Sequence, residues 1–351
     1  MAAELTDMSI PIFLAGLVLL LIFVHDLVTT TLSSKGAGWF TRHIGVGIWA
    51  VLLAVSRLIK QRKILSYGGT TIMLSALLIW LLGIWASCTI MILSEEDSVI
   101  NIETNTPASV ASKIYYTGYT LSTFGNGDLE PGNEFWEIFT ALFSFTGLIF
   151  ISIALTYLLP VLSAEIEKQR LSAYISTLGY SVEEIIKQAW NGENLCSLEV
   201  HLPSLTSMIL HHTQNHHAYP VLHYFHTERK KDAFVLNLTN LDEVITLIRL
   251  IPEHQRPSKQ VLLPLQNAIS HYLSTVQDIY VRPAEQAPPP PSQENLAEII
   301  SLDQSQWELH YRQWAERRKM LLGLIQNDGW CWDDLEAGAF QNYRQEIEKD
   351  K

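Results

Sequence analysis

A short stretch with alternating glycines, Thr-Phe-Gly-Asn-Gly-Asp at residues 123–128, has the residue types and spacing to bind cations. Glycine adopts positive φ angles as readily as negative ones, so glycines at every second position let successive peptide carbonyls turn toward one axis. A ring of such carbonyl oxygens can replace the hydration shell of a cation. The competing interpretation is an ordinary turn, since Gly-Asn-Gly is also favourable in turns.

Histidine supplies the second group of residues that could do chemistry. Seven of the twelve histidines lie between residues 201 and 226. If that stretch is helical, imidazoles four residues apart share one face and can bind zinc or change protonation close to neutral pH. The stretch lacks the H-E-x-x-H pattern, which disfavours a zinc peptidase. The candidate metal or proton-sensing residues are His211, His212, His216 and His217, and structural roles are the competing interpretation.

Long apolar runs must position these groups, and almost all of them lie before residue 163. Of the 351 residues, 48% are hydrophobic and only 17% are charged. The runs at 10–32, 70–94 and 135–163 are each long enough to cross a bilayer core, which needs about 20 helical residues. Acidic residues before the first run argue against a signal peptide. The sequence therefore predicts a multi-pass protein of the plasma membrane.

A weaker apolar run at 45–59 is bracketed by basic residues. Its length favours a helix on the membrane surface, and a fourth span is the alternative. Asp26 is an ionisable residue inside the first apolar run. Such residues are rare and usually paired. We expect either a pairing with Arg57 or Lys60 or a static buried polar contact.

Lysine and arginine set the orientation of the spans. Residues 32–69 hold six of them and no acidic residue, whereas residues 95–134 hold one lysine and seven acidic residues. Basic residues accumulate in cytoplasmic loops. We therefore predict that 95–134 lies outside the cell and that everything after residue 163, including the C-terminus, is cytoplasmic.

The segment between the second and third apolar runs contains the glycine stretch, and residues 108–121 before it have helical spacing of apolar and aromatic residues. Irregular backbone is tolerated at membrane depth only where it lines a cavity filled with water or ions. This pattern resembles the pore loop of the tetrameric potassium-channel superfamily, whose filter reads T-x-G-[YFL]-G-D. Thr123, Gly125, Gly127 and Asp128 match it.

The resemblance covers residues 70–163 and implies a role for each segment. An outer helix would lie at 70–94, a pore helix at 108–121, the filter at 123–128 and an inner helix at 135–163. Filter carbonyls would bind K⁺ as the permeant ion, with no cofactor. One loop supplies a quarter of the ring, which implies a homotetramer. The residues with implied roles are, for ion binding, Thr123, Phe124, Gly125, Asn126 and Gly127; for filter support and the outer mouth, Tyr115, Tyr116 and Asp128; and for a gating hinge, Gly147 and Pro160.

Asn126 departs from the family pattern, in which the residue between the two glycines is aromatic and bonds outward to pore-helix aromatics. We expect the Asn126 amide to bond Tyr115 or Tyr116, or else to leave a looser filter. Potassium is the favoured ion, and a non-selective monovalent cation channel is the alternative. A second alternative is a membrane-anchored sensor or regulatory protein with a degenerate pore loop.

The predicted fold is an all-α membrane protein, with a potassium-channel-like pore module, an extra N-terminal transmembrane helix and a mainly helical cytoplasmic C-terminal domain. Its predicted parts are the N-terminal helix with the basic surface helix (1–69), the pore module (70–163), a helical cytoplasmic domain (164–281), a proline-rich linker (282–292) and a C-terminal helical unit (293–351). The net charge of −12 argues against nucleic-acid binding. We expect no enzyme, because no nucleophile–base pair is evident. The sequence does not indicate which cytoplasmic regulator acts on the protein.

Overall fold

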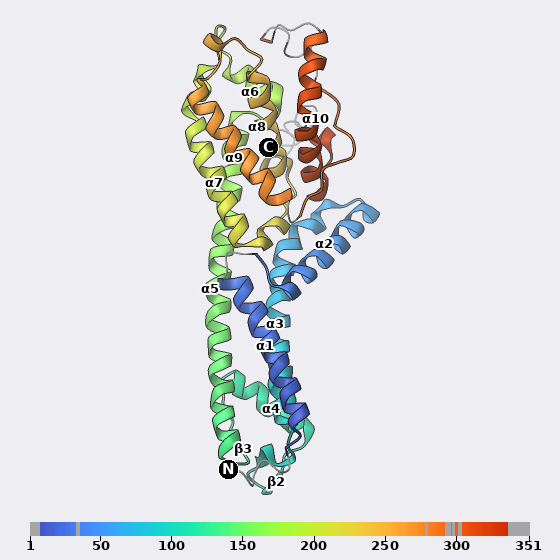
Figure 1. Cartoon of the computed structure of the whole chain (residues 1–351), viewed down its shortest axis with the longest axis vertical. Helices are drawn as coiled ribbons and strands as arrows, with labels where there is room; N and C mark the ends of the chain where they lie inside the picture. Colours follow the sequence, from blue (N-terminus) through green and yellow to red (C-terminus); the bar gives the residue numbers. More distant parts are fainter. Residues whose placement is uncertain are drawn as a thin grey trace, which may run out of the picture. The chain divides into compact units, whose positions relative to one another are not determined.

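The computed structural model describes residues 8–32, 36–277, 280–291, 296, 299–300 and 304–335. It divides into two compact units, which are described separately (Figure 1). The first unit comprises Met1–Gly47 and Thr70–Leu162, and the second comprises Ile48–Gly69 and Ser163–Lys351.

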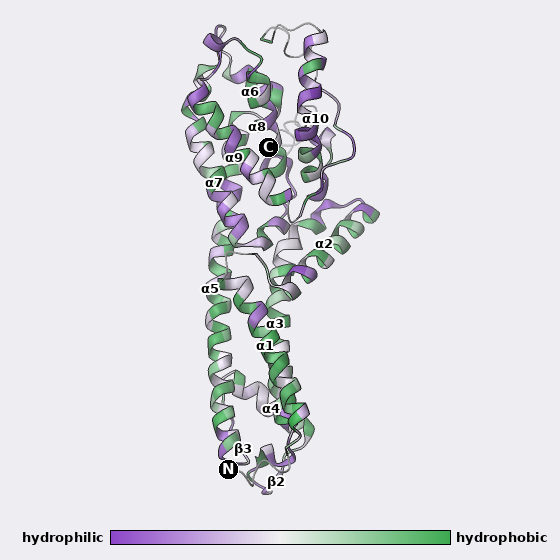
Figure 2. Ribbon diagram, in the orientation of Figure 1, coloured by the Kyte–Doolittle hydropathy of each residue, from purple (hydrophilic) through white to green (hydrophobic). Residues whose placement is uncertain are grey.

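Three long apolar helices form the first unit. They are α1 (Ile10–Leu32), α3 (Gly68–Ile92) and the first part of α5 (Glu134–Leu178). The described residues include four helices long and apolar enough to cross a membrane, the fourth being α2 (Trp39–Ile59). Hydrophobic colouring dominates α1, α3 and the first part of α5 (Figure 2). The prediction of an all-α membrane protein is therefore confirmed.

Helices α1 and α3 pack antiparallel. Gly16 near the start of α1 lies against Met91 near the end of α3, and Phe23 lies against Gly83. The end of α1 and the start of α3 therefore lie on the same side, so the chain between them leaves and returns on one side of the membrane. A single crossing by α2 would break this arrangement, which favours α2 as a surface helix.

Asp26 binds the N-terminus of α2, not the basic residues at its other end. Its carboxylate accepts from the Phe40 amide at 2.8 Å and from the Thr41 hydroxyl at 2.7 Å. The Trp80 indole of α3 donates to the same carboxylate at 2.9 Å. The expected pairing with Arg57 or Lys60 is therefore wrong. A helix N-terminus has unpaired amides and a partial positive charge, both of which a carboxylate satisfies.

A small antiparallel sheet, which was not predicted, joins the two ends of the pore loop. Its strands β1 (Val99–Asn101), β2 (Thr106–Pro107) and β3 (Leu129–Pro131) run in the order β2-β1-β3. Ile100 of β1 pairs with Glu130 of β3. The helix α4 (Val110–Leu121) and the glycine stretch lie in the chain between β2 and β3. The sheet therefore ties the chain before α4 to the chain after the filter.

In the described part of the second unit, the regular secondary structure is helical, with turns and loops between the helices. Its core helices are α6 (Val182–Ala189), α7 (Leu202–Ala218), α8 (Phe234–Ile248), α9 (Lys259–Gln277) and α10 (Gln304–Asn327). Short 3-10 segments complete the described helices: η2 (Arg62–Tyr67), η3 (Glu96–Ser98, in the first unit), η4 (Cys196–Val200), η5 (Pro220–Tyr224), η6 (Lys230–Asp232), η7 (Glu253–Gln255) and η9 (Trp332–Leu335).

Helix α8 is the centre of this unit, and every one of its residues is buried. Two acidic residues on α8 meet two arginines on α10. Arg317 Nε donates to Asp242 Oδ2 at 2.7 Å, and Arg318 Nε donates to Glu243 Oε1 at 2.8 Å. Pairing is what makes charge tolerable in an interior, so these two contacts fix α10 against α8.

The domain boundaries differ from the predicted ones in two places. The second half of α2 and all of η2 belong to the second unit, where Trp49 Nε1 donates to Asn327 O at 3.1 Å and Arg62 pairs with Asp334 at 3.0 Å. The predicted linker is docked rather than free, because the Pro288 carbonyl accepts from the Tyr311 hydroxyl. Residue 292 of that linker and residues 293–295, 297–298, 301–303 and 336–351 of the predicted C-terminal unit lie outside the described residues.

Candidate ion-conducting site

Helix α4 delivers the chain to the filter. Its N-terminus is capped by Ser109, whose side chain accepts from the Ser112 amide at 3.2 Å. On one side the Trp85 indole of α3 donates to Ile114 O at 3.0 Å, and on the other the Tyr116 hydroxyl bonds Thr140 of α5 at 2.7 Å. The C-terminal end of α4, which carries about half a negative charge, runs directly into the filter. This arrangement places a partial negative charge next to residues 123–127.

The filter backbone alternates in handedness. Positive φ angles occur at Thr123 (60°), Gly125 (57°) and Gly127 (79°), and not at the residues between them. Thr123 is β-branched, and such a residue is strained at positive φ by about 1–3 kcal/mol. Strain of this size persists only where the surroundings impose it. The alternation is the geometry that turns successive carbonyls toward one axis.

The filter residues are uncovered within one chain. Nothing lies within 4 Å of where a Cβ would stand on Gly125 or Gly127. Phe124 is 70% exposed although it is a large apolar residue. The backbone of residues 123–127 therefore has its alternating conformation within one chain, but no other part of that chain covers Phe124, Gly125 or Gly127.

Tyr119 of α4 holds both ends of the filter, a role that the sequence reasoning missed. Its carbonyl accepts from the Phe124 amide at 3.0 Å, and its hydroxyl donates to Leu129 O at 3.2 Å. The ring is 8% exposed and lies between Tyr115 and Tyr116, at centroid distances of 5.0 and 5.2 Å. A third tyrosine four residues before the filter threonine was the available signal.

The residues predicted to support the filter and its outer mouth, Tyr115, Tyr116 and Asp128, differ in burial. Tyr116 is buried and bonds Thr140 on the inner helix, so it fixes α4 to α5. Tyr115 is 47% exposed. No described residue of the same chain forms a hydrogen bond with the Asn126 side chain, and therefore the expected bond to Tyr115 or Tyr116 is not formed within one chain. Asp128 is exposed beside the filter, and its carbonyl accepts from the Ile102 amide at 3.2 Å.

Gly147 lies where α5 crosses the end of α4. A Cβ at this position would overlap the carbonyl oxygen of Leu121, the last residue of α4. Only glycine allows the two backbones to approach this closely. Pro160 lies within α5, which is continuous from Glu134 to Leu178 through both predicted hinge residues. The structure thus gives Gly147 a packing role, and the hinge role stays a prediction.

A buried polar network outside the filter anchors the pore loop. Lys113 of α4 is 5% exposed, and its ammonium donates to the carbonyls of Glu95 and Glu96, each at 2.7 Å. The Glu95 carboxylate accepts from the Trp136 indole at 2.8 Å. Glu95 is itself buried and connects the start of α4 to the start of α5.

The predicted histidine quartet is not one site. His212 and His216 are buried, whereas His211 and His217 face solvent on the other side of α7. Among the described residues, no group of three or more histidine, cysteine, aspartate or glutamate side chains could hold a metal ion. The structure therefore does not bring His211, His212, His216 and His217 together as one metal site. Residues four apart on a helix share a face, as the buried pair His212 and His216 does, whereas their sequence neighbours His211 and His217 point in other directions, toward solvent.

Comparison with known proteins agrees with the geometry of the pore loop. Residues 79–164 match a family model described as an ion channel. The uncharacterized membrane protein YdjJ of Bacillus subtilis (strain 168) is 32% identical over 334 residues, which cover 94% of this chain and 97% of the relative. The chain belongs to the potassium-channel superfamily.

This membership confirms the resemblance drawn from Thr123, Gly125, Gly127 and Asp128, and it makes the protein a membrane-embedded ion channel. The family match ends at residue 164, close to where the second unit begins. The second unit is thus covered by the Bacillus relative and, from residue 165 onward, not by the family model. No solved structure matches this chain.

Proposed function

We propose that the protein is a homotetrameric potassium channel whose filter is formed by the backbone carbonyls of residues 123–127. The observation that carries this proposal is the alternation of positive φ at Thr123, Gly125 and Gly127, on a stretch that follows directly from the C-terminus of the half-buried helix α4. Carbonyls arranged in this way replace water around a dehydrated cation. Thr123 would add its hydroxyl at the inner end of the filter.

The uncovered apolar surface supports assembly into a tetramer. On α5, Phe145 is 62% exposed and Leu148 is 52% exposed, and both flank Gly147 on the helix that follows the filter. Only 17% of the apolar window of α5 is buried within one chain. An exposed apolar helix beside an uncovered filter fits neighbouring subunits around a common axis, with lipid covering the remainder.

Potassium is the favoured ion because the filter is held at both ends. Tyr119 fixes the amide of Phe124 and the carbonyl of Leu129, which bracket the four residues that include Asn126. These two hydrogen bonds of Tyr119 can fix the filter in place of the outward contact that an aromatic residue at position 126 would make. A non-selective monovalent cation channel is the second candidate, favoured by the absence of a partner for Asn126 among the described residues of one chain.

We place the channel in the plasma membrane with its C-terminal unit in the cytoplasm, following the distribution of basic residues. Helix α2 would lie on the inner surface of the bilayer. It buries Trp49 and Ser56 on one face and exposes Val51 (61%) and Leu58 (83%) on another. An amphipathic helix of this kind binds a lipid interface through its exposed apolar face.

Flux measurements on purified protein test the proposal. Liposomes containing the wild-type chain should take up K⁺ and should be blocked by Ba²⁺, and Gly125→Ala should abolish uptake because alanine at φ 57° is strained. Gly47→Ala is the matched control, because a Cβ there meets nothing within 4 Å. Uptake that is unchanged by Gly125→Ala, or a particle that is a single subunit, would favour a sensor with a degenerate pore loop.

A further inference from the structure

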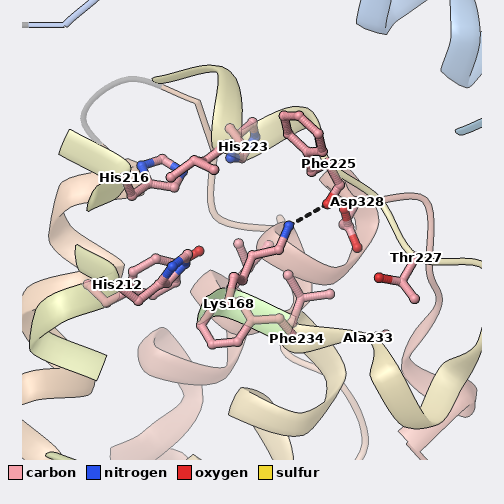
Figure 3. Close-up of a pocket in the computed structure, with 13 residues that line it drawn as sticks. Lys168, His212, His216, His223, Phe225, Thr227, Ala233, Phe234 and Asp328 are labelled. Atoms are coloured by element: carbon pink, nitrogen blue, oxygen red, sulfur yellow. Dashed lines mark hydrogen bonds between the residues drawn. The ribbon is translucent and has the colours of Figure 1, made fainter. Parts of the chain in front are cut away.

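A small buried cavity in the cytoplasmic unit is lined by one lysine and three histidines (Figure 3). Its volume is about 30 Å³. Lys168 comes from the part of α5 that continues the inner helix, His212 and His216 come from α7, and His223 comes from η5. Three separate elements of the unit therefore meet around these side chains.

Several imidazole nitrogens in this cavity have no hydrogen-bond partner. The Nδ1 atom of His212 and both ring nitrogens of His216 are buried without a hydrogen-bond partner. His223 Nε2 lies 2.6 Å from Asn327 Oδ1, so the proton is on Nε2. A neutral imidazole tolerates this environment far better than a charged one does.

Burial sets the protonation state of the three histidines. It lowers the pKa of His212 to about 3 and that of His223 to about 4, and it lowers the pKa of His216 well below the ordinary value. The ammonium of Lys168 acts in the same direction at all three positions. The closed cavity therefore excludes protons that the same side chains would bind if they were exposed to water.

Two further charged groups line the cavity, Lys168 and Asp328, and the Asp328 carboxylate raises the pKa of His223 against the larger effect of burial. Lys168 Nζ pairs with Glu165 Oε2 at 2.8 Å and donates to the Phe225 carbonyl at 2.6 Å (Figure 3). Asp328 Oδ2 lies 3.3 Å from His226 Nδ1. On the solvent face of α7, His211 pairs with Glu167 at 3.0 Å and His217 is exposed. Tyr272 of α9 also lines the cavity, and Tyr280 stacks on His223 at 4.3 Å, and neither of them carries charge near neutral pH.

The two residues that follow His223 touch both helices that lead to the pore. We call Tyr224 and Phe225 the clasp. Phe225 holds Lys168 of α5 through its carbonyl, and its ring fills the space next to Gly69, at the start of α3. The Tyr224 ring lies 5.7 Å from that of Trp49, and its carbonyl lies beside Gly68. The clasp thus connects the continuation of the inner helix to the beginning of the outer helix.

We propose that His212, His216 and His223 form a proton-operated switch, in which their protonation as the pH falls below about 6.5 opens the cavity, releases the clasp and changes the open probability of the channel. A protonated imidazole at His212 or His216 would be buried close to Lys168, whose charge opposes its protonation. At His223 the carboxylate of Asp328 acts in the opposite direction, but burial has the larger effect. Opening the cavity to water removes the repulsion from Lys168. The effect on conduction rests on the proposed function, whereas the opening of the cavity does not.

The direction and size of the effect follow from proton linkage. A histidine whose pKa is lowered in the closed state favours that state above the ordinary pKa, and the preference is lost as the pH falls through 6.5 toward the lowered value. Between about pH 7.5 and pH 5.5, each such histidine shifts the equilibrium about tenfold toward the open state. Three histidines acting independently set an upper limit of about a thousandfold.

Hydrogen exchange on the full-length protein in lipid nanodiscs tests the opening. After correction for the intrinsic effect of pH, amides of residues 219–227 should open at least tenfold more often at pH 5.5 than at pH 7.5. The triple variant His212→Gln/His216→Gln/His223→Gln should lose this response. The control His211→Gln/His254→Gln/His271→Gln removes three exposed histidines and should keep it.

Two further measurements keep the test decisive. If the triple variant does not fold, His216→Gln alone should lose about tenfold of the response. Potassium flux should change with cytoplasmic pH in the wild type and not in the triple variant. Exchange that is equal at both pH values, or a response that the triple variant retains, would overturn the switch. Absence of flux at every pH, with exchange that still responds, would instead refute the proposed conduction.

Discussion

Removing one hydroxyl from the pore helix tests whether the filter is held as the structure indicates. Tyr119→Phe keeps the ring between Tyr115 and Tyr116 and deletes the 3.2 Å hydrogen bond to Leu129 O. A neutral hydrogen bond contributes about 0.5–1.5 kcal/mol net. Because this bond is long and Leu129 is only 7% exposed, we expect about 1 kcal/mol per subunit. That loss shifts each filter strand about fivefold toward a distorted state.

In the proposed tetramer, four such losses act on one filter and together amount to about 4 kcal/mol if they are independent. Tyr119→Phe should therefore reduce the preference for K⁺ over Na⁺ and shorten the time that the channel stays conductive. Single-channel recordings in planar bilayers measure both quantities. Tyr115→Phe is the matched control, because Tyr115 is 47% exposed and should leave both unchanged. A Tyr119→Phe channel that behaves like the wild type, or a larger effect of Tyr115→Phe, would refute the reasoning.

Three further predictions concern packing and buried charge. Gly147→Ala should prevent assembly or cost about 1–3 kcal/mol of stability by overpacking, whereas Gly47→Ala should not, as size-exclusion chromatography and thermal unfolding will show. Asp26→Ala should cost about 1–2 kcal/mol of stability by uncapping α2, and an unchanged unfolding temperature would contradict the cap. Arg317→Met leaves Asp242 buried without its cation and should cost about 3–5 kcal/mol in chemical denaturation.

The sequence was sufficient to predict what depends on local pattern. Glycines at positions 125 and 127 require the conformations that the structure shows, because the requirement is a property of the residues themselves. The three long apolar helices follow from composition and length in the same way.

What escaped prediction depends on contacts between distant parts of the chain. Asp26 caps a helix that begins thirteen residues later, and nothing in its neighbours indicates whether a carboxylate meets an amide or a cation. Tyr119 differs from Tyr115 and Tyr116 only in the direction that its side chain takes once α4 is packed. The assignment of η2 to the second unit agrees with the pairing of Arg62 with Asp334, which are 272 residues apart.

The histidine cluster is a second case in which local pattern predicts part of the structure and distant contacts decide the rest. Spacing correctly groups His212 with His216 on one face of α7. It does not reveal that this face is closed by Lys168 and His223, which come from other elements. Burial, and not the number of histidines, decides whether such side chains bind metal, protons or neither.

The most direct test of the central claim is the reversal potential of the purified channel in a planar bilayer. With a tenfold K⁺ gradient and equal Na⁺ on both sides, the proposed filter predicts a reversal potential shifted by about 59 mV toward K⁺ equilibrium. Gly125→Ala should carry no current. A reversal potential near zero in the wild type would show that the stretch from Thr123 to Gly127 does not select potassium, and current through Gly125→Ala would show that ions pass elsewhere.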